Sequence, residues 1–438
     1  MKNIEYVCLS VVIAILTVTS CRKTEAEILT PSNQLDYRFP SEQFTAIWNS
    51  MNTNYAMWDI ESVDWTSVKE EYMPEFMELD DSVKSGYSIA TSHLSQLYTD
   101  ILGNLTDHHA YFSFTNLWAD KYDIDFFSVS PGMIEIKGRD YYHKEHIWSK
   151  YIKMMLDEPI YAEYFGIESW DDLTMVGWLK KMEEAGRASD IKYGSVQDLI
   201  TVVSGLIDGN IPYIHISDFN LTEIISMYDG EELDQDVIDT YNAYDSFRQN
   251  VLNIPEVKGV IVDVRENGGG YLNDQFYLLG LLIDEPVQMG WSRHKTGLGR
   301  YDYSPWIPHV FSPGPQHRKI DGPVVIVSDL YSVSMAEIST IMVQAMPNGC
   351  FIGERTFGGH GVLSPDFEES YSGTFGSRDS NHFGYLSTRM VKDFNGEILE
   401  GIGAIPDIEM PFPYSPDDFR DGKDSWLTRA VDYINNGR

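Results

Sequence analysis

Short apolar, β-branched runs alternate with helical patterns through the C-terminal half of this chain. Three of these runs, at residues 210–219, 258–267 and 322–330, read NIPYIHISDF, KGVIVDVREN and GPVVIVSDL. Between the first two lies DQDVIDTYNAYDSFRQNVL, whose apolar residues recur at helical spacing. Alternation of strands and helices predicts an α/β core built on a largely parallel sheet.

Three consecutive glycines, Gly268, Gly269 and Gly270, follow the second strand in VIVDVRENGGG. Glycine lets a backbone approach a neighbour closely, or present its N–H groups to an anion. The stretch lacks the G-x-G-x-x-G spacing of a dinucleotide site, and no phosphate-binding lysine follows it. We therefore interpret the loop as a source of backbone donors for an oxyanion, braced by Arg265 and Asn267.

The third strand ends near Asp329, and a helix is predicted to begin near Met335, which places Ser334 at the N-cap. Two interpretations of this serine are open. Ser334 and Glu337 have the spacing of a capping box, which needs no chemistry. Alternatively, the positive end of the helix suits a nucleophilic oxygen that becomes part of an oxyanion intermediate.

The composition excludes several classes of partner. The chain has 438 residues and a formal net charge of -35, from 67 acids against 32 bases. Such a charge argues against a nucleic-acid partner and against electrostatic binding to anionic lipid. Cys350 lies in an apolar stretch and is predicted to be a core residue. Two histidines, His143 and His146, do not make a metal site alone, so we expect no metal and no cofactor.

The N-terminus is typical of an export signal. Lys2 precedes an apolar run from Val7 to Val18, which is short for a membrane span and fits a signal peptide over residues 1–20. The sequence VTSC resembles a bacterial lipobox and predicts lipidation at Cys21. An ordinary signal peptide with a chance cysteine is the alternative. We expect an exported lipoprotein, anchored to a membrane of the bacterial cell envelope through a tether at residues 21–40.

The rest of the chain divides by pattern into three parts. Residues 41–115 have helical apolar spacing and predict an N-terminal helical domain. Residues 116–200 form an intervening small domain, with a degenerate PDZ-like domain as one interpretation, and GMIEIKG within it is interpreted as a strand. Residues 201–438 are expected to form the catalytic core.

Taken together, these motifs resemble peptidase family S41, the C-terminal processing (tail-specific) proteases and their tricorn-like relatives. The resemblance rests on KGVIVDVRENGGG and SDLYSVSMAE, and extends to GERTFGGHG and EGIGAIPDIEM. It implies a crotonase/ClpP-like core of ββα units. The processing proteases use a Ser–Lys dyad, but Gly359 stands at the position of the lysine, so the dyad is unsupported.

The tricorn-like branch uses a serine, a histidine and a glutamate, and its motifs match here. LTDHHAYF resembles the D-G-H-T element, which implies that His109 is the base, with His108 or His360 as alternatives. EGIGAIPD implies that Glu400 is the orienting acid. The nucleophile would be Ser334. The oxyanion hole would consist of the N–H groups of Gly268 or Gly269 and of Met335.

The resemblance implies a serine endopeptidase that cleaves peptides or unfolded protein segments. The alternative is a catalytically inactive S41-like lipoprotein that binds polypeptides or envelope ligands. Aromatic abundance alone suggests a third function, as a partner of glycan uptake machinery. The ordinary pKa of histidine is about 6.5, so activity would rise with an apparent pKa of roughly 6 to 7.5.

Replacing Cys21 by serine is expected to release the protein from the membrane, because a lipidated cysteine carries the acyl chains that hold it there. Fractionation of cells into soluble and detergent-extracted membrane material checks this. Membrane association that survives Cys21→Ser would contradict the lipobox interpretation.

Overall fold

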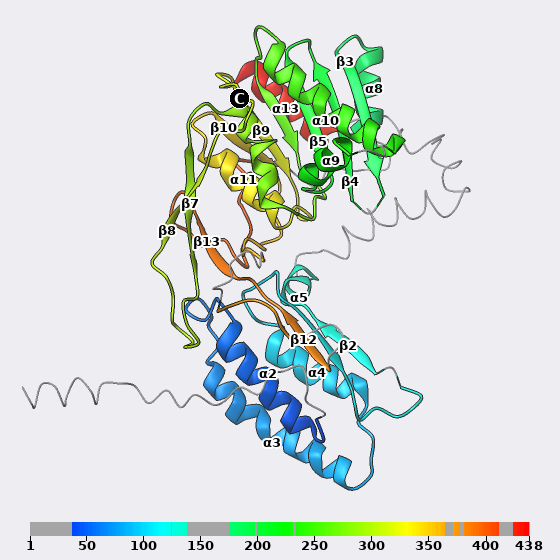
Figure 1. Ribbon diagram of the computed structural model, residues 1–438, viewed down its shortest axis with the longest axis vertical. Helices are drawn as coiled ribbons and strands as arrows, with labels where there is room; N and C mark the ends of the chain where they lie inside the picture. The colour runs from blue at the N-terminus through cyan, green and yellow to red at the C-terminus, as the bar shows by residue number, and fades with distance from the viewer. Residues whose placement is uncertain are drawn as a thin grey trace, which may run out of the picture.

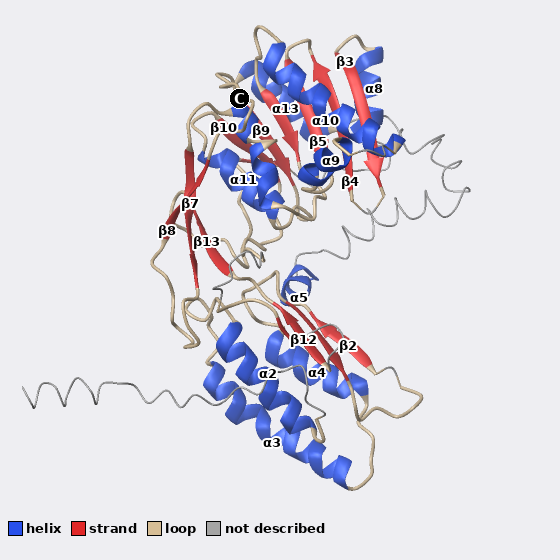
Figure 2. Ribbon diagram, in the orientation of Figure 1, coloured by secondary structure: helices blue, strands red, loops and turns tan. Residues whose placement is uncertain are grey.

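The computed structural model of the chain describes residues 37–123, 125–137, 175–197, 199–230, 234–363, 371–376, 381–410 and 424–437. The expected α/β class is confirmed, because helices flank a seven-stranded sheet in the upper body of Figure 1. A helical body lies below it, and a three-stranded sheet runs along one side between the two (Figure 2). Cys21, the expected signal peptide, His143 and His146 lie outside the described residues.

The core sheet has the strand order β14-β10-β9-β6-β5-β4-β3. Neighbours from β14 to β5 are parallel, whereas β4 and β3 are antiparallel additions. The strand bounds are β3 Ala188–Val196, β4 Ile200–Ile207, β5 Ile211–Ile216, β6 Val260–Asp263, β9 Val324–Ser328, β10 Gly349–Gly353 and β14 Ile408–Glu409. Strand β3 therefore brings residues that we expected in the intervening domain into the core sheet, ahead of residue 201.

Helices cover both faces of this sheet, which explains why its strands are apolar runs and not alternating ones. Val260 and Val262 of β6 pack on one face, and Ile261 packs on the other. Cys350 of β10 belongs to the second face, so its predicted core position is confirmed. The helices are α9 Leu221–Tyr228, α10 Gln235–Asn253 and α11 Met335–Ala345 on the first face, and α8 Met175–Glu184 and α13 Ser425–Asn436 on the second.

The N-terminal body contains the predicted helices and also a sheet. Its elements are α2 Pro40–Asn54, α3 Trp65–Lys84, α4 Thr91–Leu102, β1 Tyr111–Thr115, β2 Phe126–Val129 and α5 Pro131–Lys137. The sheet order is β11-β12-β1-β2, so strands β11 (Phe375–Gly376) and β12 (His382–Tyr385) come from the C-terminal half. The interpretation of GMIEIKG as a strand was wrong, because its described residues, 132–137, lie in helix α5.

The third sheet has the order β13-β7-β8 and links the two bodies. Its strands are β7 Val287–His294, β8 Ile307–Phe311 and β13 Arg389–Asp393, and two short 3-10 helices, η3 Leu272–Phe276 and η4 Gly280–Leu282, precede it. No helix within the described ranges is both long enough and apolar enough to cross a membrane.

A buried ion triad joins the end of β6 to the C-terminal helix. Nη2 of Arg265 lies 2.7 Å from Asp263 Oδ2 and 2.7 Å from Asp424 Oδ2. Burial alone would raise the pKa of Asp263, but the guanidinium of Arg265 reverses this and holds that pKa below its ordinary value. Asp424 also caps α13 by accepting the Trp426 N–H at 3.0 Å. The triad therefore fixes the strand end from which the glycine loop departs.

Replacing Arg265 by glutamine is expected to lower the free energy of unfolding by about 3–5 kcal/mol, because it leaves buried carboxylates without their cation. Arg187→Gln is the matched control, since Arg187 pairs with Asp208 in an exposed bridge and its loss should cost about 0–1 kcal/mol. Urea unfolding followed by circular dichroism measures both. Equal losses in the two variants would contradict a structural role for the triad.

Candidate active site

Asn267 organises the glycine loop at the end of β6. Its side-chain amide donates to the Ile216 carbonyl at 2.9 Å, and its Oδ1 accepts the Gly269 N–H at 2.8 Å. Its own carbonyl accepts the Val333 N–H at 2.9 Å, which ties the loop to the segment before α11. The bracing role expected for Asn267 is thus present in the structure.

The backbone N–H groups that we expected to bind an oxyanion are not all free to do so. The Gly269 N–H already donates to Asn267, so the structure does not leave it for an oxyanion. The Gly268 N–H and the Met335 N–H, the latter at the positive end of α11, have no acceptor among the described residues. Gly268 and Met335 therefore remain the candidate donors, and Gly269 is corrected to a different role.

That different role is steric. Gly269 has φ +102°, and a Cβ on it would lie 2.5 Å from Cβ of Ser334. Gly270 has φ +137°, and a Cβ there would lie 2.3 Å from the carbonyl oxygen of Phe219. Both glycines are required because the loop passes directly against Ser334 on one side and the β5–α9 connection on the other.

Ser334 lies at the N-cap of α11 with φ 59° and ψ -117°, a backbone conformation that residues other than glycine rarely adopt. Its side chain makes no capping hydrogen bond. The capping-box interpretation is therefore wrong, because the hydroxyl is not used to satisfy the helix end. Strain of this kind costs about 1–3 kcal/mol and persists where the surroundings impose it.

Glu337 binds a distant loop instead of Ser334. Its Oε1 accepts from Thr356 Oγ1 at 2.5 Å and from the Gly358 N–H at 2.7 Å, and its Oε2 accepts from the Gly359 N–H at 2.7 Å. Nδ1 of His360 lies 3.7 Å from the same carboxylate. Glu337 thus anchors the loop after β10 to the first turn of α11.

His109 lies on the opposite loop, just before β1. Both of its ring nitrogens are shielded from solvent and have no hydrogen-bond partner among the described residues. The ring packs near Gly359, because a Cβ at that glycine would lie 3.5 Å from ring carbons of His109. Burial, with the neighbouring His360 adding to it, lowers the pKa of His109 from 6.5 to about 4. The expected apparent pKa of 6 to 7.5 is therefore too high for this state of the protein.

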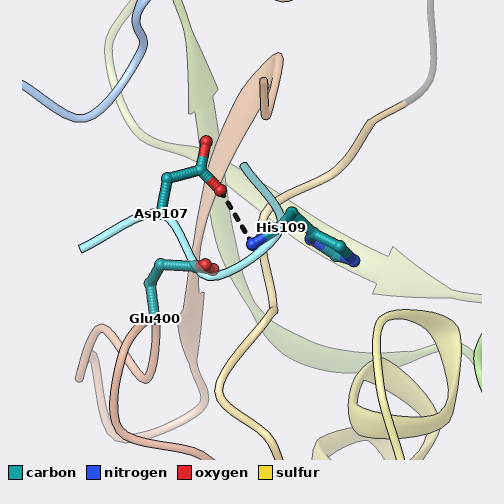
Figure 3. Close-up of side chains that lie close together, drawn as sticks. All are labelled: Asp107, His109 and Glu400. Carbon is teal, nitrogen blue, oxygen red and sulfur yellow. Dashed lines mark hydrogen bonds between the residues drawn. The ribbon is translucent and has the colours of Figure 1, made fainter. Parts of the chain in front are cut away.

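Asp107 fixes the backbone of this loop. Its Oδ1 accepts the His109 N–H at 3.1 Å, and Oδ2 accepts the Ser387 N–H at 2.9 Å. The dashed line in Figure 3 is the first of these bonds. Burial raises the pKa of Asp107 to about 6, which its hydrogen bonds only partly oppose.

Glu400 acts on His109 through the backbone and not through the imidazole. Its Oε1 accepts the His108 N–H at 2.8 Å, and its Oε2 accepts the Gly361 N–H at 2.6 Å. Figure 3 shows the His109 ring directed away from both carboxylates. We expected Glu400 to fix the tautomer of His109 by a direct bond; in the structure it accepts instead from the peptide N–H before His109 and from a peptide N–H of the neighbouring loop. Burial, and then the charge of Asp107, raises the pKa of Glu400 well above its usual range.

Asp107, His109 and Glu400 offer potential metal-ligand atoms that all lie within 4.8 Å of one another. Both carboxylates already accept backbone N–H groups, and the ring points elsewhere in Figure 3. We therefore describe the group as a hydrogen-bonded bracket for the backbone around His109.

Sequence reasoning missed two members of this site. Asp107 stands in LTDHHAYF, two residues before the base, where an Asx-type side chain commonly accepts a local N–H. That spacing was an available signal. Glu337 was noted only as a capping residue, because nothing local indicates that Thr356 and Gly358 would fold back onto it.

The α/β core thus presents a strained serine at a helix start, beside a glycine loop. Residues 210–410 match the model of peptidase family S41. The fold class that the resemblance implied is confirmed.

Two relatives place the chain near the tricorn proteases. It is 26% identical over 227 residues to the tricorn protease of Thermoplasma volcanium, which covers 52% of this chain and 18% of that protein. It is 25% identical over 227 residues to the putative tricorn-like protease C-terminal subunit of Sulfurisphaera tokodaii, covering 51% of this chain and 21% of that one. The match thus spans only about a fifth of the length of these curated relatives.

Two solved structures share the fold across most of the chain. A putative peptidase from Parabacteroides merdae has a TM-score of 0.57 at 17% identity, covering 91% of this chain and 97% of that one. Mature CPAF complexed with lactacystin has a TM-score of 0.52 at 12% identity, covering 91% and 99%. At these identities the likeness establishes the fold alone.

Gly269→Ala is expected to abolish the approach of the loop to Ser334, because its Cβ would overlap the serine side chain. Gly268→Ala is the matched control, since its Cβ meets nothing nearer than Asp218 Oδ1 at 3.8 Å. We expect Gly269→Ala to lower the free energy of unfolding by about 1–3 kcal/mol and Gly268→Ala to change it little. Urea unfolding of both variants measures this. An unchanged free energy of unfolding in Gly269→Ala would refute the close approach of the loop to Ser334.

Proposed function

We propose that the chain is a serine endopeptidase that cleaves peptides or unfolded protein segments, with Ser334 as nucleophile and His109 as base. The observation that carries this proposal is the state of Ser334: a strained residue at the positive end of α11 whose hydroxyl caps nothing. A hydroxyl kept out of structural hydrogen bonds at such a position is available for attack on a carbonyl.

The reaction follows from the groups around it. Ser334 Oγ attacks the carbonyl carbon of the scissile peptide while a ring nitrogen of His109 takes its proton. The carbonyl oxygen becomes an oxyanion that accepts from the N–H groups of Gly268 and Met335, each worth about 2.7–4 kcal/mol. The intermediate collapses, the C–N bond breaks, and His109 returns the proton to the leaving amine. Water, activated by the same base, then hydrolyses the acyl ester.

The low pKa of His109 has a counterpart in its surroundings. A buried imidazolium is costly in the resting protein, but a ring nitrogen of His109 lies within 4.8 Å of a carboxyl oxygen of Asp107 and of Glu400. These groups stabilise the developing positive charge, and their hydrogen bonds to the backbone keep the base in place. Glu400 is therefore proposed as a positioning residue.

A second function has one observation in its favour. Neither Ser334 nor the His109 ring has a hydrogen-bond partner among the described residues, so the two are not bonded to each other. A polypeptide-binding protein that does not cut would show the same separation. In active enzymes, too, catalytic hydrogen bonds can be absent from the apo structure and form only when substrate binds. A fluorophosphonate probe distinguishes the peptidase from the binding protein, since only an activated Ser334 would be labelled.

Ser334→Ala is expected to abolish peptide hydrolysis and fluorophosphonate labelling, and His109→Ala to lower kcat/KM by several orders of magnitude, because the two act as a unit. Glu400→Gln should cost less. Ser339→Ala is the matched control, since Ser339 is buried in the same helix with an unbonded hydroxyl, and His93→Ala, on the surface, is the control for histidine. Full hydrolysis by purified Ser334→Ala would refute the assignment of the nucleophile.

The pH profile tests the identity of the base. His109 must be neutral to accept a proton, and its lowered pKa keeps it neutral well into the acid range. The acid limb of kcat/KM should therefore fall with an apparent pKa below 6.5, towards about 4. Initial rates on a peptide between pH 3.5 and 8 measure it. A limb centred at 7 or above would show that the shielded His109 is not the titrating base.

We also propose that the protein acts outside the cytoplasm, held at a membrane of the cell envelope by acylated Cys21. The support is the sequence VTSC after an apolar run. The polypeptide substrate and the lipid anchor are the partners this proposal implies, and no nucleic acid is among them.

A further inference from the structure

Four carboxyl groups lie in succession behind the His109 loop: Glu61, Asp107, Glu400 and Glu337. The charge of Glu61 acts on Asp107, and the charges of Asp107 and Glu337 act on Glu400. Their hydrogen bonds come from neutral amides and hydroxyls. Within the described ranges, no lysine or arginine forms an ion pair with any of the four. The region therefore gathers acids without a matching cation, so a positive charge that enters it favours their ionised forms.

A cavity of about 650 Å³ opens onto the middle of this series. Glu400 is the single acid among its lining residues, and Thr106, Asn104 and His108 add polar atoms. Ile60 and Ile134 line it from the N-terminal body, whereas Ile398 and Ile402 line it from the loop that carries Glu400. Ile402 is 46% exposed, which places it at the mouth. Neither Ser334 nor His109 lines the cavity, so it is separate from the reacting groups.

We propose that this cavity binds a small organic cation, with an alkylammonium head against Glu400 and an apolar body along the isoleucines. The volume is in the range of small-molecule sites, which combine apolar walls with a few polar groups that converge. The head group follows from charge: the lining offers a carboxyl group and no lysine or arginine. A carboxylate ligand would meet like charge from Glu400 and from Asp107 behind it.

Binding of a cation in this cavity would also affect the backbone that positions His109. Both oxygens of Glu400 hold backbone N–H groups next to His109, those of His108 and Gly361. A cation in the cavity favours the charged form of Glu400, which strengthens both bonds. This link to catalysis rests on the proposed function, whereas the binding itself does not.

The test of binding uses full-length Ser334→Ala protein and isothermal titration calorimetry with three probes: n-hexylammonium, 1-hexanol and hexanoate. We expect hexylammonium to bind at least about tenfold more tightly than hexanol, since a charge-assisted bond replaces a neutral one. Hexanoate should not bind. Equal binding of the three probes, or none by hexylammonium, would overturn the proposal. A dipeptide amide with a free amino terminus is compared with its N-acetyl form. Tighter binding of the free-amino form would indicate that the cavity accepts the amino terminus of a peptide as well as a simple amine.

Cavity variants locate the binding. Ile134→Trp and Ile402→Trp fill the cavity from two different segments, and each should weaken hexylammonium binding at least about tenfold. Ile307→Trp, at an exposed position of β8, is the control. If Ile134→Trp fails to fold, Ile402→Trp on the rim decides alone. Undiminished binding by folded Ile402→Trp places the amine elsewhere and refutes the site.

Two further measurements separate this inference from the proposed function. Glu400→Gln should bind hexylammonium and hexanol equally, a readout independent of activity. Wild-type kcat/KM on a peptide should change by at least about twofold at saturating hexylammonium. An unchanged kcat/KM would refute the link between the cavity and catalysis, but not the binding of the amine in the cavity. Activity in Ser334→Ala would refute the proposed function without affecting any of the binding results.

Discussion

Buried backbone N–H groups must find acceptors, and the loops around Ser334 have no regular structure to supply them. Four buried side chains take that role: Asn267, Asp107, Glu337 and Glu400. Each one joins its own segment to the loop that needs the acceptor. The positions of the serine, the glycines and the histidine therefore depend on side chains that themselves do no chemistry.

This way of holding loops has an electrostatic consequence. Three of the four acceptors are carboxyl groups, and the ring nitrogens of His109 are shielded from solvent, so charge of either sign is costly there. The pKa of His109 falls and that of Glu400 rises for the same reason, which is burial. The resting site keeps His109 neutral, and in the proposed reaction the carboxyl groups would support the imidazole once it acquires a proton. One arrangement of buried acids thus serves both as scaffold and as electrostatic support.

The sequence predicted those features that depend on neighbouring residues in the chain. Strands β5, β6 and β9 are apolar because both faces of the sheet are covered, and Ser334 was placed at the N-cap of α11 from the strand–helix boundary alone. The resemblance to family S41 added His109 and Glu400, which the structure brings to one bracket. Long-range pairing was not predictable: β12 joins β1 across the whole core, and Glu337 turns to Gly358. The competition between Asn267 and an oxyanion for the Gly269 N–H also depends on a side-chain rotamer that spacing does not reveal.

The bond between the His108 N–H and Glu400 joins residues that are 292 positions apart in the chain, and strand β1 completes its sheet only with β12. Synthesis proceeds from the N-terminus, so the histidine loop emerges long before the segment that secures it. Serine, histidine and their supports come together only when nearly the whole polypeptide has been made. The long-range pairing of the fold therefore delays assembly of the candidate site until the chain has almost been completed.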